Sequence, residues 1–584
     1  MSYEVMFQNA VSLHEAGQLD EAESLYRQIL ETAPNHPDIL NLLGLVAQAK
    51  GVQNEACALF MQAIKSKPNE PSFYFNLAFS CKLNDKPIEA LEYFRKVATI
   101  APQIKETYNE IAILLMQMNN VEEARKNWRY AIDLDSKYAE ARANMAWSYR
   151  NENLGKAIAD LENLSLTSSL EPMVFYYLAQ LYIERGLIEK AWSAAIKAKD
   201  LAPASDEIRV LLGKLSIIDN KQENAKIYFS KAELINPNNV EALLSLANLY
   251  SKNSDFCKAE TRYKRVIEIL PNSYDAHNNY AEMLQRSNRL PEALEEYRKA
   301  ILINPKSAET SNNLAMILRD MGNFDEALGL LFNALAYRPE MEEISINITE
   351  TLIMLSKINC EKSIKIAENW LKCNPENVFA RQINSALKGE SIGNNQIYTE
   401  KLFDNFADNY ELVMQNLDYS VPLAMGRIAG PLQGRIVDLG CGTGLVGQAI
   451  KNDWNQIIGV DVSQKMLDIA STKGVYCELI KADIEEYLTN NSDFDWVVAA
   501  DVFNYFGELN TIIKHIKNKK ILFSIEVLDD DANYRVQNTV RYKHNPVYVE
   551  KLLREYGFSD ITKKEIVLRT EDGVPVKGMI FKGE

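Results

Sequence analysis

The stretch GRIVDLGCGTGLVGQAI, residues 434–450, decides the fold of the C-terminal third of the chain. In it an apolar run ends at Leu439, a turn with three alternating glycines follows, and an apolar-faced helix comes next. The turn glycines are Gly440, Gly442 and Gly444. This order predicts the first half of a βαβ nucleotide-binding unit, whose turn backbone approaches a ligand that side chains would obstruct. Leu445 stands where a dinucleotide-binding loop has its third glycine, so the spacing favours a nucleoside without a pyrophosphate.

Polar residues also close the next three apolar runs, QIIGV, YCELIKAD and FDWVVAADVFNYF. The polar residues at the ends of the first three runs are Asp438, Asp461 and Asp483. Those after the fourth run are Asp501, Asn504 and Tyr505. An open α/β sheet binds its ligand at the carboxyl ends of its strands, so these side chains are expected around one site. The alternative for any single Asp is a cap on the following helix. Asp461 lies about where a Rossmann-like fold places the acid that accepts from both ribose hydroxyls.

The whole segment, with DLGCGTG at its centre, resembles motif I of class I S-adenosylmethionine-dependent methyltransferases. The resemblance implies S-adenosylmethionine as the cofactor. It implies that Asp438 supports the methionine amino group and that the glycine turn packs against the methionyl part. Asp483 would meet the adenine amino group, and Ile484 would lie against the ring.

Two further segments extend this resemblance. ITKKEIVLR and VPVKGMIFK flank the turn signal TEDG, which predicts an antiparallel hairpin similar to the closing hairpin of the same fold. YTEKLFDNFADNYE and RYKHNPVYVEKLLREYGF resemble predicted bacterial methyltransferases that carry tetratricopeptide repeats. In such proteins the first segment folds over the cofactor, which makes Phe406 and Tyr410 lid candidates. An amphipathic helix that packs its aromatic residues is the alternative.

The N-terminal two thirds repeat with a period of 34 residues. Alanine marks each unit at Ala22, Ala56, Ala90, Ala124, Ala157, Ala191, Ala225, Ala259, Ala293 and Ala327. A large aromatic residue stands four positions later in most units, on the same helix face, at Tyr26, Phe60, Phe94, Trp128, Phe229, Tyr263 and Tyr297. Proline follows the alanine by twelve residues in most units, where a second helix must end. The pattern resembles the tetratricopeptide repeat family and predicts an α-solenoid.

The expected organisation is an array of ten to eleven repeats over residues 3–377, a capping helix and linker over 378–396, and a catalytic domain over 397–584. The unit around Ala157 lacks the proline and carries Leu161 in place of the aromatic residue, so we expect an irregular joint near residues 150–172. VFARQINSALKG, after Pro375, is expected to cap the array with a polar-faced helix.

A solenoid of this kind has a concave groove lined by the first helix of each unit. In the family the sixth position of the unit faces that groove, and here it is Asn76, Asn144, Asn279 and Asn313. An amide side chain both donates to and accepts from an extended backbone, so these residues suggest a protein or peptide ligand. The alternative is that these amides are simply solvated.

Candidate catalytic residues are Asp501, Tyr505 and His544. The first two follow the fourth strand, where the family holds acceptor-binding groups, and His544 is a candidate base. The alternative for His544 is a surface position, with Arg541 paired to one of Asp529, Asp530 or Asp531. The NPPY signature of enzymes that methylate planar amino nitrogens is absent from the sequence, which disfavours DNA or glutamine as acceptor.

Charge and composition argue against a nucleic-acid-binding or membrane-inserted protein. The net charge of −16 opposes binding to nucleic acid, and the sequence has no apolar run long enough to insert in a membrane. The N-terminal sequence has no signal-peptide pattern, so a cytoplasmic protein is expected. Seven scattered cysteines without paired spacing or nearby histidines predict no metal site.

Two functions fit these observations. In the first, a methyltransferase modifies a protein or peptide that the repeat groove recruits. In the second, it modifies a small molecule or glycan, and the array is an assembly scaffold.

Overall fold

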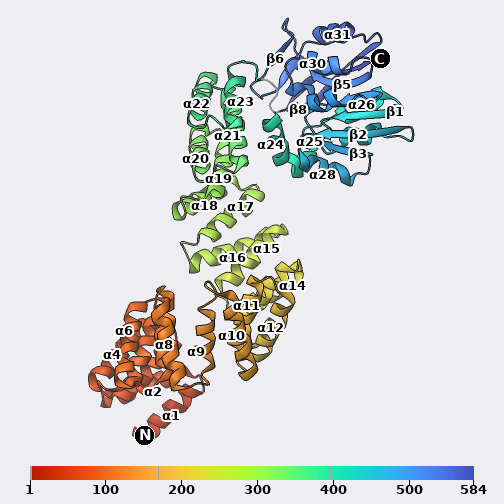
Figure 1. Ribbon diagram of the computed structural model, residues 1–584. Coiled ribbons are helices and arrows are strands. Elements are labelled where there is room, and N and C mark those ends of the chain that lie inside the picture. The colour runs from red at the N-terminus through yellow and green to blue at the C-terminus, as the bar shows by residue number, and fades with distance from the viewer. Residues whose placement is uncertain (1–2, 169, 393–395, 572) are drawn as a thin grey trace. The chain divides into compact units, whose positions relative to one another are not determined.

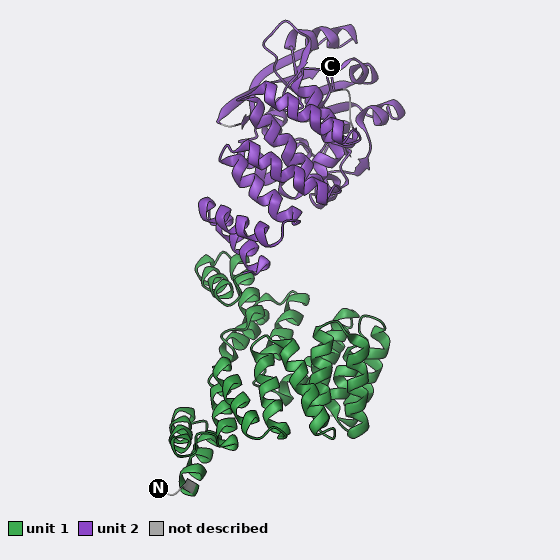
Figure 2. Ribbon diagram, turned by 90° about the vertical axis from the view of Figure 1, so that its left-hand side faces the viewer, with its two compact units in different colours: residues 1–271 green, residues 272–584 purple. Residues whose placement is uncertain are grey.

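The computed structural model describes residues 3–168, 170–392, 396–571 and 573–584. The chain divides into two compact units, Met1–Pro271 and Asn272–Glu584 (Figure 2). Among the described residues eleven helix pairs follow one another from α1 to α22, so the predicted α-solenoid is confirmed.

The first unit holds eight of these pairs (Figure 1). Their first helices are α1 (Tyr3–Glu15), α3 (Pro37–Ala49), α5 (Pro71–Leu83), α7 (Lys105–Gln117), α9 (Ala139–Trp147), α11 (Pro172–Glu184), α13 (Asp206–Ile218) and α15 (Val240–Lys252). Their second helices are α2 (Leu19–Thr32), α4 (Gln53–Ser66), α6 (Pro87–Ile100), α8 (Val121–Leu134), α10 (Leu154–Thr167), α12 (Ile188–Leu201), α14 (Gln222–Ile235) and α16 (Phe256–Ile269).

The second unit begins with the remaining pairs and continues into an α/β domain. The pairs are α17 (Tyr274–Arg286) with α18 (Leu290–Ile303), α19 (Ala308–Asp320) with α20 (Phe324–Tyr337), and α21 (Glu342–Ser356) with α22 (Cys360–Cys373). α23 (Val378–Leu387) follows, and then come α24 (Gln396–Phe406), η1 (Ala407–Asn409), α25 (Tyr410–Asn416) and α26 (Val421–Ala429).

The repeat signature explains the packing inside each pair. All ten marker alanines are fully buried, and the aromatic residues four positions later are at most 2% exposed. The alanine allows the helices to approach closely while the ring fills the adjacent space. Leu161 takes the place of the ring in α10 and is also fully buried.

The joint expected near residues 150–172 falls next to a shortened helix. α9 has 9 residues, whereas first helices such as α7 have 13. The hydrophobic core is also divided at α9, because one cluster of buried residues ends at Ala141 and the next begins at Ala139. Residue 169, within the expected joint, lies outside the described residues.

α23 differs from the polar-faced cap that the sequence suggested. Seven of its ten residues are buried, including the polar side chains Gln382 and Asn384. The ring of Phe379 packs edge-on against Tyr398 of α24 with centroids 5.2 Å apart. The helix packs against α21 and α22 and, through Phe379, against α24, so it joins the array to the α/β domain.

The α/β domain is built on a seven-stranded sheet of order β3-β2-β1-β4-β5-β9-β8. Its strands are β1 (Gly434–Leu439), β2 (Asn455–Asp461), β3 (Glu478–Lys481), β4 (Trp496–Ala499), β5 (Lys520–Glu526), β8 (Ile561–Glu571) and β9 (Val574–Gly583). β1 to β5 are parallel, and β9 and β8 form the predicted antiparallel hairpin. The Rossmann-like fold with its closing hairpin is therefore confirmed.

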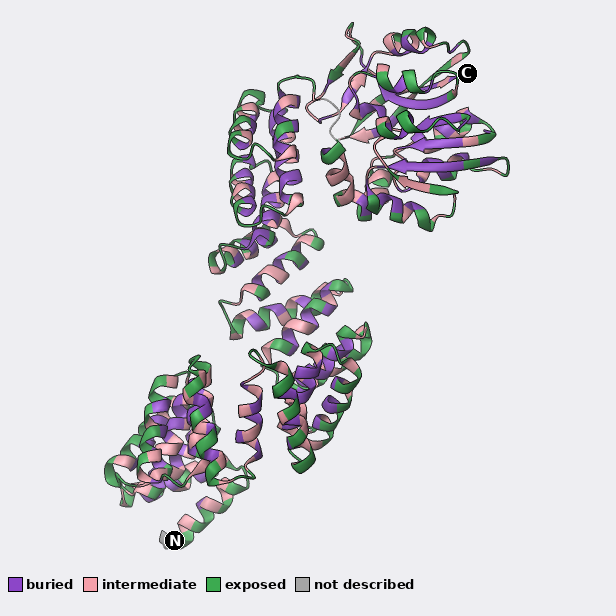
Figure 3. Cartoon of the chain, in the orientation of Figure 1, coloured by how far each residue is buried: buried purple, intermediate pink, exposed green. Residues whose placement is uncertain are grey.

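Helices and short elements complete the domain. They are α27 (Leu445–Ile450), α28 (Gln464–Thr472), α29 (Ile484–Asn490), η2 (Phe503–Tyr505), α30 (Asn510–His515), α31 (Pro546–Glu555) and the ribbon β6 (Tyr534–Val536) with β7 (Tyr542–His544). The central strands are buried on both faces (Figure 3), as parallel sheets are. Alternate residues of β1 enter two cores, Val437 with α29 and α30 and Ile436 with α26 and α27.

A glycine in the array should be intolerant of even one added carbon. A Cβ on Gly213 would lie 2.5 Å from Cε1 of Phe229, whose ring is 1% exposed and has no room to shift. We expect Gly213→Ala to lower the free energy of unfolding by about 1–3 kcal/mol. Urea titration of the full chain followed by far-UV circular dichroism measures this.

Gly329→Ala is the matched control, since it lies exposed in helix α20 with nothing within 4 Å of an added Cβ. It should raise stability by about 0.5–1 kcal/mol because helical glycine is entropically costly. Equal effects of the two substitutions would contradict the packing described.

Candidate active site

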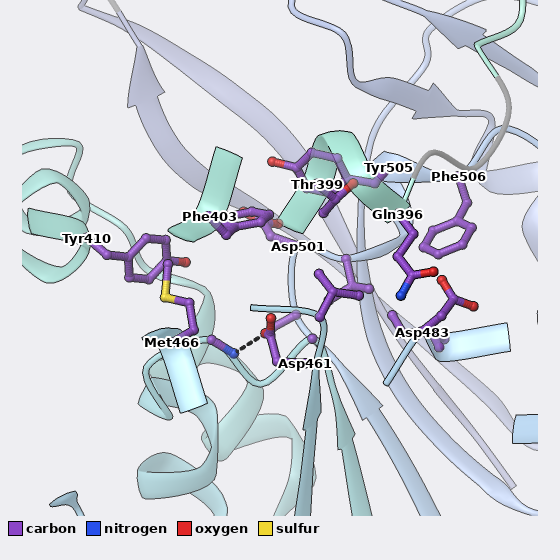
Figure 4. A pocket seen from close by; sticks show the side chains of 16 residues that line it. Gln396, Thr399, Phe403, Tyr410, Asp461, Met466, Asp483, Asp501, Tyr505 and Phe506 are labelled. Atoms are coloured by element: carbon purple, nitrogen blue, oxygen red, sulfur yellow. Dashed lines mark hydrogen bonds between the residues drawn. The ribbon is translucent and has the colours of Figure 1, made fainter. Parts of the chain in front are cut away.

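A cavity opens at the carboxyl ends of the central strands (Figure 4). The strand order reverses between β1 and β4, and such a switch point is where open α/β sheets bind ligands. The cavity is lined by Gln396, Thr399, Phe403, Tyr410, Gly440, Gly442, Asp461, Val462, Met466, Asp483, Ile484, Ala500, Asp501, Val502, Tyr505 and Phe506. Five of the seven predicted cofactor residues line it, namely Gly440, Gly442, Asp461, Asp483 and Ile484.

The glycine turn needs its glycines for two reasons. Gly440 has a φ of 60°, and a Cβ there would lie 2.6 Å from Cγ2 of Val502. Gly442 has a φ of 53° and nothing within 4 Å of an added Cβ, so its backbone borders open space. The turn therefore presents bare backbone to the cavity, as predicted.

Asp461 is held by the backbone at the end of β2. Its Oδ2 accepts from the N–H of Gly442 at 2.8 Å, and its Oδ1 accepts from the N–H of Ser463 at 2.9 Å. Burial raises the pKa of Asp461 to about 6, against the opposing effect of these backbone donors. The carboxylate is thus fixed in direction and faces the cavity (Figure 4).

Asp483 caps a helix and also borders the cavity. Its Oδ1 accepts from the N–H groups of Glu485 and Glu486 at 2.8 and 3.2 Å and caps α29. The same residue lines the cavity, and Ile484 beside it is 7% exposed.

Asp438 and Gly444 lie behind the cavity lining. Asp438 is 1% exposed, and its Oδ2 accepts from the hydroxyl of Tyr476 at 2.8 Å. Burial raises the pKa of Asp438 to about 7. An added Cβ on Gly444 would contact the same tyrosine at 3.0 Å. Sequence reasoning missed Tyr476, because nothing in the run before β3 distinguishes it from a core tyrosine.

Asp501 follows β4 in the left-handed region, with a φ of 55°. A non-glycine residue in that region costs free energy, and such strain is concentrated at functional sites. Its Oδ2 accepts from Nη1 of Arg569 at 2.8 Å, and its Oδ1 accepts from the hydroxyl of Ser524 at 3.2 Å. Burial raises the pKa of Asp501, and the neighbouring guanidinium of Arg569 partly offsets the rise.

Asp501 belongs to a buried ionic cluster with Glu526, Arg541, Arg569 and Glu571. Arg569 also pairs with Glu526 and, at 2.7 Å, with Glu571. Nη2 of Arg541 donates to Glu571 at 2.5 Å, and its Nε lies 3.5 Å from Glu526. The alternative that paired Arg541 with an aspartate in 529–531 at the surface is wrong, because its guanidinium pairs with Glu571 and Glu526 instead.

His544 lies outside the cavity, in β7. It is fully buried, and its Nε2 forms a hydrogen bond of 3.0 Å with the carbonyl oxygen of Gly507. Burial lowers its pKa to about 4. Both readings from the sequence therefore fail, since it is neither a surface residue nor a member of the cavity lining. Asn504 is likewise 2% exposed and does not line the cavity.

The segment before the first strand contributes two aromatic rings to the cavity lining. Tyr410 of α25 and Phe403 of α24 line it, and the Phe403 ring lies 5.6 Å from the ring of Tyr505. Phe406 lines a neighbouring cavity instead. α24 is tied down because the hydroxyl of Ser463 donates to Asp404 at 2.5 Å.

Family models agree with this geometry. A model described as a methyltransferase domain matches residues 436–519, which include the glycine turn and the ends of β2 and β4. Two tetratricopeptide repeat models match residues 7–71 and 244–309, and residues 296–329. The chain carries tetratricopeptide repeats and a methyltransferase domain.

Curated relatives match one part or the other. YqeM of Bacillus subtilis, described as a "Putative methyltransferase", is 28% identical over 121 residues, which is 20% of this chain and 49% of that protein. BBSome complex member BBS4 of Bos taurus is 24% identical over 179 residues, 30% of this chain and 34% of that protein. The chain thus spans half or less of the length of these relatives. A solved tetratricopeptide repeat protein from Parabacteroides merdae is 19% identical, with a TM-score of 0.39 over 42% of this chain and 97% of that one.

The predicted groove asparagines bond within the array. Nδ2 of Asn76 donates to Oδ1 of Asn41 at 2.9 Å, and Nδ2 of Asn144 donates to Oδ1 of Asn109 at 3.1 Å. In the second unit Asn313 is a hydrogen-bond partner of the Tyr297 hydroxyl, and Asn279 accepts from Nδ2 of Asn278 at 3.2 Å. Asn76 and Asn144 thus link neighbouring first helices, and Asn313 links its helix to the preceding second helix, roles that the sequence did not reveal.

Two other features of the described residues bear on function. No group of three or more His, Cys, Asp or Glu side chains among them is arranged to hold a metal ion. None of the helices in the described ranges is long and apolar enough to cross a membrane.

The buried Asp438 makes the stability of the methyltransferase domain depend on pH. An unfolded Asp ionises near pH 4, whereas folded Asp438 keeps its proton to about pH 7. Between these values the folded state binds more protons, so the free energy of unfolding falls as the pH rises from about 4 to about 7. Asp438→Asn should flatten this decline.

The measurement is urea titration at several pH values with 5-fluorotryptophan NMR, which follows Trp496 in β4. Asp453→Asn, at an exposed position of the same domain, is the control and should keep the wild-type slope. Identical slopes for the wild type and Asp438→Asn would show that this carboxyl does not titrate as described.

Proposed function

We propose that the methyltransferase domain transfers a methyl group from S-adenosylmethionine to an acceptor that reaches Asp501 and Tyr505. The observation that carries the proposal is that Gly440, Gly442, Asp461, Asp483 and Ile484 meet in one cavity at the strand switch point. They come from the ends of three strands, β1, β2 and β3, so their convergence depends on the fold.

The cavity fits this cofactor. The open space next to Gly442 allows close approach of a methionyl chain to the turn backbone. Asp461, fixed by two backbone N–H groups, has further lone pairs for the two hydroxyls of a ribose. Asp483 and Ile484 would hold the adenine. Asp438, which lies in β1 just before the turn, would support the methionine amino group.

The cofactor, when bound, supplies an activated sulfonium methyl, so no covalent intermediate with the protein is needed. The residues of the chain align the acceptor in line with the departing sulfur and exclude water. Phe403 and Tyr410 close the cavity, and Asp501, whose pKa burial raises, accepts a proton from the acceptor. His544 has no part in this scheme, because its imidazole forms a hydrogen bond with the carbonyl oxygen of Gly507.

In the first candidate function the array recruits a protein or peptide. The length of the array supports this role, and so do its repeats, because tetratricopeptide repeats generally bind proteins. The second candidate is a small-molecule or glycan methyltransferase with the array as a scaffold. The groove asparagines favour neither candidate function, because amides such as that of Asn144 already form hydrogen bonds inside the array.

Removal of the ribose-binding carboxylate should weaken cofactor binding. Asp461→Ala would leave the hydroxyl donors of the ribose without an acceptor, and we expect a loss of about 1–3 kcal/mol in binding free energy. Isothermal titration of the full chain with S-adenosylhomocysteine measures this. Asp468→Ala, on the exposed face of α28, should bind as the wild type does. Unchanged affinity in Asp461→Ala would remove this residue from the proposed site.

Asp501→Asn should impair transfer but not cofactor binding. Loss of a general base costs about 10²–10⁴ in rate, and Arg569 keeps Glu526 and Glu571 as partners. Labelled methyl transfer into a fixed lysate fraction gives the rate, and titration with S-adenosylhomocysteine gives the affinity. The wild-type rate should rise with pH as Asp501 ionises, and the variant should lose that rise. A variant that keeps both the rate and the pH profile would contradict the role.

A further inference from the structure

A second cavity of about 240 Å³ lies next to the first, entirely within the second unit. Its lining includes Ile353, Phe379, Phe403, Tyr410, Tyr505 and Arg541. These residues come from the last repeat, from α23 to α25, and from the methyltransferase domain. The predicted cofactor residues are absent from this lining.

The two cavities adjoin. Phe403, Tyr410 and Tyr505 line both of them. Asp501 lines the first cavity (Figure 4). A ligand whose stem lies in the second cavity would therefore place its terminal group at these three rings, on the side of Asp501.

The last repeat supplies the far wall. Ile346, Thr349, Glu350 and Ile353 recur at the three- and four-residue spacing that puts them on one face of α21. The helix is fastened at both ends, since Lys401 of α24 pairs with Glu342, and Nδ2 of Asn538 donates to the hydroxyl of Ser356 at 3.1 Å. The array thus contributes side chains to this cavity in addition to any role as a scaffold.

The chemistry of the lining disfavours an anion. Six aromatic rings face the cavity, from Phe379, Tyr398, Phe403, Phe406, Tyr410 and Tyr505. The cation Arg541 is already engaged by Glu571 and Glu526, and in its cluster three carboxyl groups accompany two guanidinium groups. Aromatic faces attract cations, most strongly where water is excluded. A primary alkylammonium group is a cation that such rings would attract.

We propose that this second cavity binds the methyl acceptor and that the acceptor is a primary amine on an apolar stem, free or as a protein side chain. The inference rests on the proposed methyl transfer and adds the acceptor class. The ammonium end reaches past the shared rings into the first cavity and passes a proton to the Asp501 carboxylate. The nitrogen lone pair then attacks the sulfonium methyl, so that an N–CH₃ bond forms, the S–CH₃ bond breaks, and a methylated amine and a thioether result.

The first test compares probes that differ in charge. Hexylamine and hexanoate are titrated into the full chain saturated with S-adenosylhomocysteine, and hexylamine should bind at least tenfold more tightly. Equal or tighter binding of hexanoate would overturn the amine assignment. A peptide with one internal lysine is the third probe, and preference for it over hexylamine would identify a protein side chain as the source of the amine.

The second test fills the cavity from the array side. Ile353→Trp should lower hexylamine affinity at least tenfold while S-adenosylhomocysteine affinity stays within twofold. Met354→Trp, the next residue of α21 and no part of the lining, should change neither. Unchanged hexylamine affinity in Ile353→Trp would overturn the cavity assignment. Failure of the wild type to bind S-adenosylhomocysteine would instead contradict the proposed function itself.

Discussion

The parallel register of β1 between β2 and β4 is the constraint on which the site depends. Val437 pairs with Ile458 on one side and with Val497 on the other, so all three strands end at one edge of the sheet. Gly440, Asp461 and Asp501 follow these ends and therefore meet, although up to 61 residues separate them in the sequence. A slip of one strand by one residue would exchange its two buried faces and move its polar end out of the cavity.

The array and the catalytic domain are linked by packing as well as by the chain. The final helices do not end in a solvated cap, because Phe379 packs on Tyr398 and α21 faces a cavity that also touches Tyr505. The last repeat is consequently part of the proposed acceptor site. Changes in that repeat would then alter which acceptor fits the proposed site.

Much of this was predictable from the sequence because it depends on local rules. Three local patterns each favour one backbone arrangement: an alanine with a ring four residues later, a proline after a helix, and a glycine turn after an apolar run. Ala22 with Tyr26, and Gly440 before α27, adopt the arrangement that their pattern predicts. Contacts between distant segments were not predictable. The Tyr476–Asp438 hydrogen bond, the burial of His544 and the pairing of Arg541 with Glu571 join residues 30 or more positions apart or depend on which side of the sheet a short strand takes.

Hydrogen exchange of the full chain with and without S-adenosylhomocysteine tests directly whether the cofactor binds in the cavity at the strand ends. We expect slower amide exchange at residues 440–444, 461–466 and 396–410, because the turn, the end of β2 and the covering helices surround one ligand. Exchange in α1 to α16 should not change, since that unit contributes no residue to the cavity. Unaltered exchange at the glycine turn, or slowing confined to the array, would contradict cofactor binding in this cavity.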